Sequence, residues 1–174
     1  CFELPITPNY NHLDVDGDGK SEHAQQNPPL SDRAKCWEKR HFTNRWASLL
    51  SVDDLVEAVY NKVEAAGLLD RTYFVYTSDH GYKQGQWRIG TSKQHPYETD
   101  IRIPFIIRGP GIEKGSQPAQ VSANVDLLPT LLELAAGSSY AEAARVDGRS
   151  MVPFLVPSVT TAQSSEWRHH LINE

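Results

Sequence analysis

The sequence predicts an α/β fold in which helices cover both faces of a sheet. Two largely apolar runs, residues 72–78 and 103–108, are continuous rather than alternating, as in strands that are buried on both faces. Helical patterns precede and follow them, at about residues 41–67 and 126–137. The order helix, strand, strand, helix, with another strand expected from Leu171, is typical of part of such a sheet.

The composition is that of an acidic, globular chain. Its 174 residues suffice for one domain with a core, 39% of them are apolar, and the formal net charge is −5. This charge is unlike that of a nucleic-acid binder, so we expect no nucleic-acid partner. The sequence has no run of about 18 apolar residues, which a transmembrane helix needs, and no signal-peptide pattern.

The two ends of the sequence indicate a fragment of a longer protein. It begins at Cys1 rather than at Met, and residues 171–174 read like the start of a strand. We therefore do not expect the N-terminus to reveal the localisation. Cys1 and Cys36 leave three alternatives open, since they could pair with each other, pair with other parts of the protein or stay free.

Residues 1–40 are expected to form an irregular excursion of the domain. Four prolines exclude a long helix there: Pro5, Pro8, Pro28 and Pro29. From His41 to about Gly67, nine apolar residues recur at helical spacing: Trp46, Leu49, Leu50, Val52, Leu55, Val56, Val59, Tyr60 and Val63. Gly67 stands where a helix C-cap belongs, and the apolar register continues through residues 51–54. We therefore predict one long amphipathic helix.

The second half of the chain is expected to contain shorter elements. Residues 121–125 should be short and extended. Asp126 suits the N-cap of the next helix, and Pro129 suits its first turn. We expect a loop at residues 138–150 and a short helical turn at residues 151–155.

The first predicted strand ends in Asp79-His80-Gly81, at the edge of the sheet where α/β proteins place their ligands. An adjacent Asp and His suit a divalent metal, although Asp79 could instead cap the following turn. Four potential cations follow in the loop: Lys83, Arg88, Lys93 and His95. Such lysines are usually only solvated, but beside an Asp–His pair they would suit a sulfate or phosphate ester.

Several separated segments agree in order and spacing with one known family. They are Ser78-Asp79-His80-Gly81-Tyr82, Gly85-Gln86, Lys93, Tyr97-Glu98, Asp100-Ile101-Arg102, Pro104 and Arg108-Gly109-Pro110-Gly111. Together they resemble the C-terminal signature of sulfatases, and most closely the N-acetylglucosamine-6-sulfatase and heparan sulfate 6-O-endosulfatase branch. Residues 45–54 upstream, and residues 124–130, 147–148 and 167–168 downstream, fit the same branch. The resemblance identifies residues 41–174 as the C-terminal part of a sulfatase catalytic domain.

The resemblance implies an alkaline-phosphatase-like α/β/α sandwich, present here in part. It also implies a sulfuric ester hydrolase that removes sulfate from a sulfated sugar or glycosaminoglycan, with 6-O-sulfated glucosamine as the expected unit. Members of the family use one calcium ion and a formylglycine nucleophile made from the Cys or Ser of a Cys-x-Pro-x-Arg motif. Their localisation implies a secreted, lysosomal or periplasmic protein.

Site roles follow residue by residue from the same resemblance. Asp79 and His80 match two metal ligands, the second of which is Asn in many relatives. Lys93 matches the catalytic lysine that contacts the sulfate. Lys83 stands where many relatives have His, so it keeps a cation for substrate binding but no acid/base group.

The nucleophile motif is missing from this sequence. Cys36 and Arg40 have its separation, but no proline lies between them and their position is wrong. The remaining metal ligands of the family would also lie upstream, so we expect the 174 residues alone to be inactive. Two alternatives remain open: a phosphoric or phosphonic ester hydrolase of the alkaline phosphatase superfamily, and a catalytically dead sulfatase-like binding protein.

Overall fold

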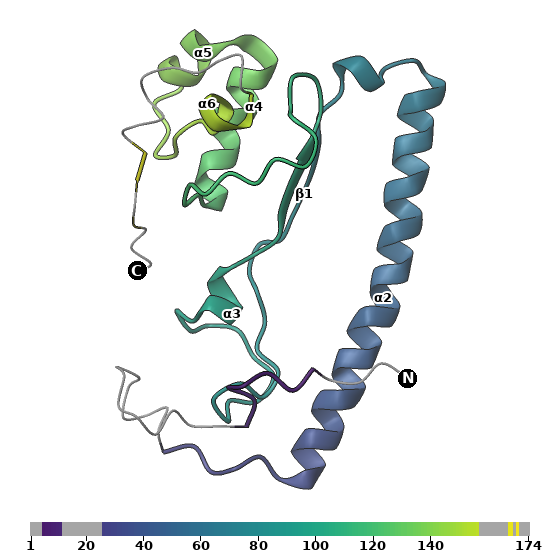
Figure 1. Cartoon of the computed structure of the whole chain (residues 1–174), viewed down its shortest axis with the longest axis vertical. Coiled ribbons are helices and arrows are strands. Elements are labelled where there is room, and N and C mark those ends of the chain that lie inside the picture. Colours follow the sequence, from purple (N-terminus) through teal and green to yellow (C-terminus); the bar gives the residue numbers. More distant parts are fainter. Residues whose placement is uncertain (1–4, 12–25, 157–166, 169, 171–174) are drawn as a thin grey trace. The chain divides into compact units, whose positions relative to one another are not determined.

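The computed structural model describes residues 5–11, 26–156, 167, 168 and 170 (Figure 1). The chain divides into two compact units. The first comprises residues 1–68 and 77–104, and the second comprises residues 69–76 and 105–174. The pairing of Cys1 and the strand expected from Leu171 lie outside the described residues.

The first unit contains one long helix, α2 (Asp32–Ala65). It begins at Asp32 rather than at His41, so the irregular segment expected for residues 1–40 ends earlier than we predicted. The Oγ of Ser31 caps the helix by accepting a hydrogen bond from the Ala34 N–H at 3.2 Å. The prediction missed this start because the first turns of α2 are mostly polar and show no apolar periodicity.

The rest of α2 agrees with the sequence. The helix runs without interruption through residues 51–54 and ends just before Gly67, which has a φ of +67° and continues the chain in a left-handed conformation. The apolar face of its second half is exposed in the described part of the chain, with Leu50 61%, Leu55 63% and Val59 47% exposed. The helix is long enough to extend well beyond its contacts within this unit.

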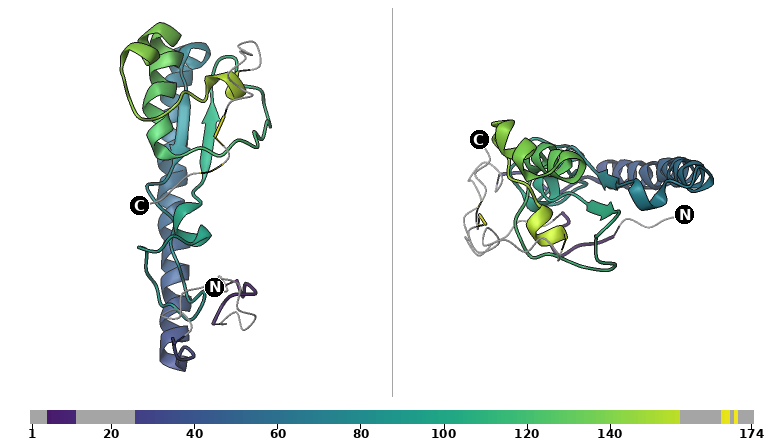
Figure 2. Two further views of the ribbon diagram at one scale, coloured as in Figure 1. Left: turned by 90° about the vertical axis from the view of Figure 1, so that its left-hand side faces the viewer. Right: turned by 90° about the horizontal axis from the view of Figure 1, so that it is seen from above.

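The sheet has two hydrogen-bonded strands among the described residues, β1 (Phe74–Thr77) and β2 (Phe105–Arg108). Figure 2 shows them side by side. Both lie within the predicted runs, but neither strand is buried throughout. Tyr76 of β1 is 40% exposed, and the side chains of β2 alternate between partly buried and exposed. Phe105 and Ile107 pack against the core of the second unit, whereas Ile106 points the other way and is 62% exposed. One face of β2 is therefore covered within this unit.

The remaining helices are short. The structure has η1 (Leu69–Arg71), α3 (Glu98–Ile101), η2 (Asn124–Asp126), α4 (Leu127–Ala136), α5 (Ser138–Ala143) and α6 (Val152–Leu155). Helices α4 and α6 confirm two predicted elements. Two expectations were wrong: part of the loop at 138–150 forms α5, and part of the extended segment at 121–125 forms η2. Alanines and a glutamate favour a helical turn in α5 once Gly137 has redirected the chain.

The core of the second unit consists of Met151, Val152, Leu155, Val156 and Trp167. Leu127 and Leu134 of α4 pack against this cluster together with the inward side chains of β2. Through this cluster, Trp167 is joined to the sheet and to α4.

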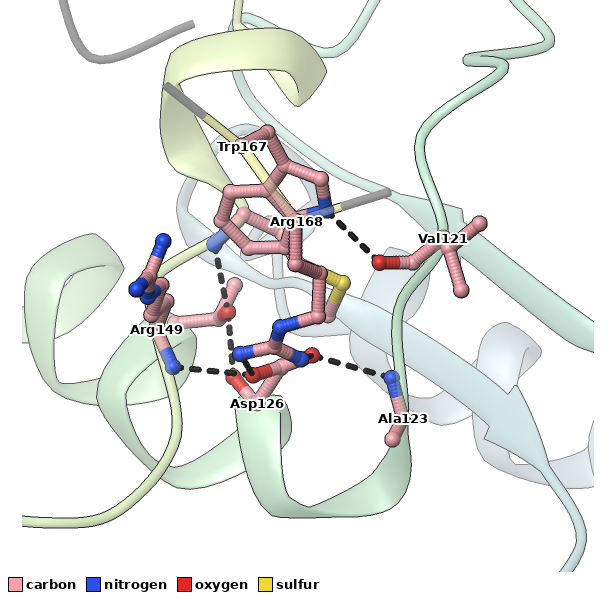
Figure 3. Close-up of polar contacts among 8 residues, drawn as sticks. Val121, Ala123, Asp126, Arg149, Trp167 and Arg168 are labelled. Atoms are coloured by element: carbon pink, nitrogen blue, oxygen red, sulfur yellow. Dashed lines mark hydrogen bonds and ion pairs between the residues drawn. The ribbon is translucent and has the colours of Figure 1, made fainter. Parts of the chain in front are cut away.

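Asp126 is the polar centre of this unit (Figure 3). Its side chain is fully buried and accepts hydrogen bonds from the backbone N–H groups of Ala123 (2.9 Å) and Arg149 (2.8 Å). Both terminal nitrogens of Arg168 also donate to its two oxygens, at 2.5 and 2.8 Å. Asp126 does precede α4, as predicted, but its carboxylate makes no capping bond to that helix. It connects three separate segments instead.

We predict that replacing Asp126 with Ala destabilises the protein by about 3–5 kcal/mol, because Arg168 loses its buried partner and two backbone N–H groups lose their acceptor. Equilibrium denaturation measures the change in the free energy of unfolding. Glu142→Ala, which removes an exposed carboxylate from α5, is the matched control and should change that free energy by less than about 0.5 kcal/mol. Equal losses in the two variants would contradict the central role of Asp126.

Candidate metal and anion site

The site begins where β1 ends. Asp79 and His80 follow the strand directly, in a turn that its own polar groups hold in place. The Oγ of Ser78 donates to the His80 carbonyl oxygen at 2.8 Å, and the His80 N–H donates to Oδ1 of Asp79 at 3.0 Å. The Asp79 side chain is 81% exposed and that of His80 is 34% exposed. Both side chains are thus accessible at the end of a strand, as the sequence predicts.

Lys93, from a later part of the same loop, contacts this turn. Its Nζ lies 2.6 Å from Nε2 of His80, and Nδ1 of His80 lies 2.7 Å from the Gly81 carbonyl oxygen. A carbonyl can only accept, so we assign the proton to Nδ1, which leaves the Nε2 lone pair to accept from the Lys93 ammonium. Oδ2 of Asp79 lies 3.1 Å from the same Nε2. Asp79, His80 and Lys93 therefore form one cluster.

A backbone hydrogen bond and a nearby cation keep Asp79 ionised. Desolvation raises the pKa of Asp79, but the hydrogen bond from the His80 N–H and the positive charge of Lys93 outweigh it, so this pKa lies below its usual value. The lowered pKa means that Asp79 is a carboxylate throughout the neutral range, which is the form that binds a metal.

The donors of this cluster fit part of a metal site. The imidazole lone pair faces the ammonium group of Lys93, and the carboxylate of Asp79 lies beside the same imidazole nitrogen. Calcium takes 6–8 ligands, mostly oxygens. The described part of the chain contains no group of three His, Cys, Asp or Glu side chains that could hold a metal ion. Asp79 and His80 can thus serve as ligands only together with further groups.

Lys83 is not part of the cluster of Asp79, His80 and Lys93. Its side chain is fully buried, and its ammonium forms an ion pair with Asp100, which is 5% exposed. The family resemblance implies that Lys83 binds substrate, but a direct contact needs an exposed ammonium, which this arrangement does not provide. Sequence reasoning had no means of finding this pair, because neither residue has a local pattern that marks it as buried.

The two remaining cations of the loop also have structural contacts. The Arg88 guanidinium donates to the carbonyl oxygen of Asn27 at 3.3 Å, which ties the loop to the segment before α2. The ring of His95 stacks on that of Tyr97, with centroids 5.8 Å apart.

The first half of α2 supports the loop. Glu38 is 2% exposed and accepts hydrogen bonds from both the N–H (2.7 Å) and the hydroxyl of Thr91. Arg45 donates to Gln84 at 2.7 Å, and its guanidinium lies 4.8 Å from the centroid of the Tyr82 ring. Sequence reasoning missed Glu38, because a glutamate in a polar stretch carries no sign of burial.

The turn also depends on a close approach of two backbone segments. The Gly81 N–H donates to the Asp100 carbonyl oxygen at 2.6 Å. A Cβ atom at Gly81 would lie 2.0 Å from the carbonyl oxygen of Thr99, far inside any contact distance. Only glycine therefore lets the turn of Asp79 and His80 pack against the start of α3.

The sequence of the chain is similar to those of known proteins. The sequence model of the sulfatase family matches residues 8–138. The chain is 39% identical over 150 residues to the extracellular sulfatase SULF-1 homolog of Drosophila melanogaster, covering 86% of this chain and 13% of that protein. It is 34% identical over 175 residues to the human N-acetylglucosamine-6-sulfatase, covering 100% of this chain and 31% of that protein. The chain therefore spans less than a third of these curated relatives.

Two solved structures have a similar fold. One, described as a complex with its substrate D-glucosamine-2-N,6-O-disulfate, superposes with a TM-score of 0.67 at 30% identity. The match covers 84% of this chain and 29% of that one. The other, a phosphonate monoester hydrolase from Silicibacter pomeroyi, gives a TM-score of 0.55 at 30% identity and covers 67% of this chain and 22% of that one.

We predict that Gly81→Ala lowers the free energy of unfolding by about 1–3 kcal/mol, because the added methyl group pushes the turn away from Thr99. Chemical denaturation measures the loss. Gly90→Ala is the matched control in the same loop, since a Cβ there meets its nearest neighbour, Oε1 of Glu38, only at 3.8 Å. A Gly81→Ala protein as stable as the Gly90→Ala protein would rule out the close packing described above.

Proposed function

The chain belongs to the sulfatase family, and we propose that it supplies the second half of a catalytic domain that hydrolyses sulfate esters of sugars. Its fold is part of the alkaline-phosphatase-like α/β fold, which confirms the fold class expected from the sequence. The observation that carries the proposal is the cluster of Asp79, His80 and Lys93. It combines ligands for a cation with a positive charge for an anion.

We propose 6-O-sulfated glucosamine, within a glycosaminoglycan or another sulfated polysaccharide, as the substrate unit. Two relatives support this choice. The human relative is named N-acetylglucosamine-6-sulfatase, and a structure that covers 84% of this chain holds a glucosamine sulfated at N2 and O6.

In this proposal, Asp79 and His80 hold a calcium ion together with ligands from other parts of the complete protein. When bound, such an ion polarises the sulfate oxygens as a Lewis acid. Lys93, which faces the same position, donates to the sulfate group and stabilises the negative charge that builds up as the ester bond breaks. His80 keeps its proton on Nδ1, donated to the Gly81 carbonyl oxygen, so that Nε2 remains available as a ligand.

The nucleophile has to come from another part of the protein. Sulfatases use a formylglycine, and Cys36 does not suit this role because it lies within the regular helix α2 and lacks the proline of the motif. We therefore propose that a Cys-x-Pro-x-Arg motif elsewhere in the complete protein supplies the formylglycine.

The family to which the chain belongs also suggests where the complete protein is located. We propose a secreted, lysosomal or periplasmic protein, in line with the Drosophila relative that is named extracellular. In the described part of the chain, no helix has the length and apolar character that crossing a membrane requires.

A second function deserves a direct comparison, because a phosphonate monoester hydrolase superposes on two thirds of the chain at the same sequence identity. Release of sulfate from a 6-O-sulfated glucosamine and of alcohol from a phosphonate monoester can be measured on the same preparation of the complete protein. Faster hydrolysis of the sulfate ester, per enzyme and per substrate, supports the sulfatase. Faster hydrolysis of the phosphonate ester favours the second function, and hydrolysis of neither ester supports a catalytically dead binding protein.

In the complete protein, we expect Asp79→Ala to lose calcium and activity together, because the carboxylate is the only negatively charged ligand in this cluster. Calorimetric titration with calcium and sulfate release from 6-O-sulfated glucosamine measure the two effects, and the rate should fall by at least about 100-fold. Asp53→Ala, which removes an exposed carboxylate from α2, is the control and should retain both properties. An Asp79→Ala protein with normal calcium affinity would refute the metal role.

Lys93→Ala should reduce mainly the rate. Removing one group that stabilises charge in the transition state costs about 100-fold in kcat. Calcium affinity should stay the same or increase, because the variant no longer has a positive charge beside His80. Lys114→Ala, at an exposed lysine of the second unit, is the control. If Lys93→Ala raised KM alone and left kcat unchanged, Lys93 would serve ground-state binding rather than catalysis.

A further inference from the structure

The buried pair of Lys83 and Asp100 has no part in the chemistry proposed above. Each side chain needs the other, because a buried ion without its partner costs several kcal/mol. We propose that this pair is a positioning device. It fixes the turn that carries Asp79 and His80 against the segment that carries Lys93, and so sets the distance between the metal ligands and the lysine.

The pair holds the turn that carries Asp79 and His80. Asp100 accepts the Gly81 N–H with its backbone oxygen at 2.6 Å, immediately after His80. Two residues later, the Lys83 ammonium binds the carboxylate of the same Asp100. One aspartate therefore holds the turn at two points, once through its main chain and once through its side chain.

The pair also holds the segment around Lys93. The main chain of Lys83 pairs with that of Ser92, with its N–H donating to the Ser92 oxygen at 2.9 Å and the reverse bond at 3.4 Å. On the other side of Lys93, the N–H of His95 donates to Oδ2 of Asp100 at 2.8 Å. Lys93 is thus fixed from both sides by the two members of the pair.

The backbone next to Lys93 gives independent support. Gln94 lies between Lys93 and His95 and has a φ of +108°, which L residues rarely adopt. Such a conformation is energetically unfavourable and persists only where surrounding contacts impose it. The bonds at Ser92 and His95 impose it here, so the ion pair stabilises a strained segment in the place where Lys93 needs it.

A positioning role also accounts for the burial of the Lys83 side chain. A direct contact with the sulfate group would require its ammonium to leave the interior, and Asp100 would then remain buried without a cation. A positioning role keeps both charges where they are.

The test uses Lys83→Met and the double variant Lys83→Met/Asp100→Asn in the complete protein. The double variant leaves no unpaired buried charge, so it remains informative if the single variant does not fold. Arg168→Met is the matched control, because it also removes the cation of a buried carboxylate pair, but in the other unit. Hydrogen exchange is measured at the amides of Gly81, Lys83 and His95, and kcat and KM are measured for sulfate release.

We expect both Lys83 variants to exchange these three amides at least about tenfold faster than the unchanged protein. Their kcat should fall by about 100-fold while KM changes less than about threefold, as for a displaced catalytic group. Arg168→Met should lose stability but keep the exchange rates of the three amides and kcat. Unchanged exchange in the double variant, or equal acceleration in Arg168→Met, would overturn the proposal.

The kinetic part of this test rests on the proposed function, but the exchange part does not. If the unchanged protein hydrolyses no sulfate ester, the proposed function fails, and exchange alone decides whether the pair holds the two segments together. If exchange accelerates while kcat stays normal, the pair holds the loop but does not position Lys93, and the inference is wrong.

Discussion

The ion pair of Lys83 and Asp100 organises the part of the chain where helices and strands give the least support. Between β1 and α3, the backbone has only isolated bridges, at Gln86 and between Lys83 and Ser92. Its buried polar groups still need partners. The carboxylate of Asp100 accepts hydrogen bonds from both the His95 N–H and the Lys83 ammonium. The loop between β1 and α3 therefore forms a defined scaffold. The cluster of Asp79, His80 and Lys93 depends on that scaffold for its geometry.

The second unit uses the same principle with different residues. Asp126 collects two backbone N–H groups and the guanidinium of Arg168, as Asp100 collects one N–H and the ammonium of Lys83. A buried carboxylate is costly unless it is fully paired, so each of these aspartates specifies one arrangement of the segments around it. Both lie within short helices, α3 and η2, where few backbone bonds are available to do this. The arginine is bidentate, whereas the lysine acts as a point charge and leaves Asp100 free to bind the loop around Lys93.

The site itself combines exposed and buried groups according to their tasks. Asp79 and His80 are accessible because a ligand has to reach them, while the residues that place them are buried. The chain covers less than a third of its curated relatives, and in the proposed function it supplies two ligands for a metal that takes at least six. A partial ligand set is therefore what a sulfatase segment of this extent should carry.

Local patterns in the sequence determined the α/β class, the two strands, the long helix and the place of Asp79 and His80. These patterns are apolar runs, helical spacing, and polar residues directly after a strand. Lys93 joined Asp79 and His80 through the resemblance to sulfatases rather than through a local pattern. The first turns of α2 and the helix α5 were not foreseen, because a capping serine and good helix formers outweigh the absence of an apolar pattern. Only the tertiary structure decided that Lys83 is buried with Asp100 and that Glu38 supports Thr91. A charged residue carries no local signal of burial, since the partner that makes its burial tolerable lies far away in the sequence.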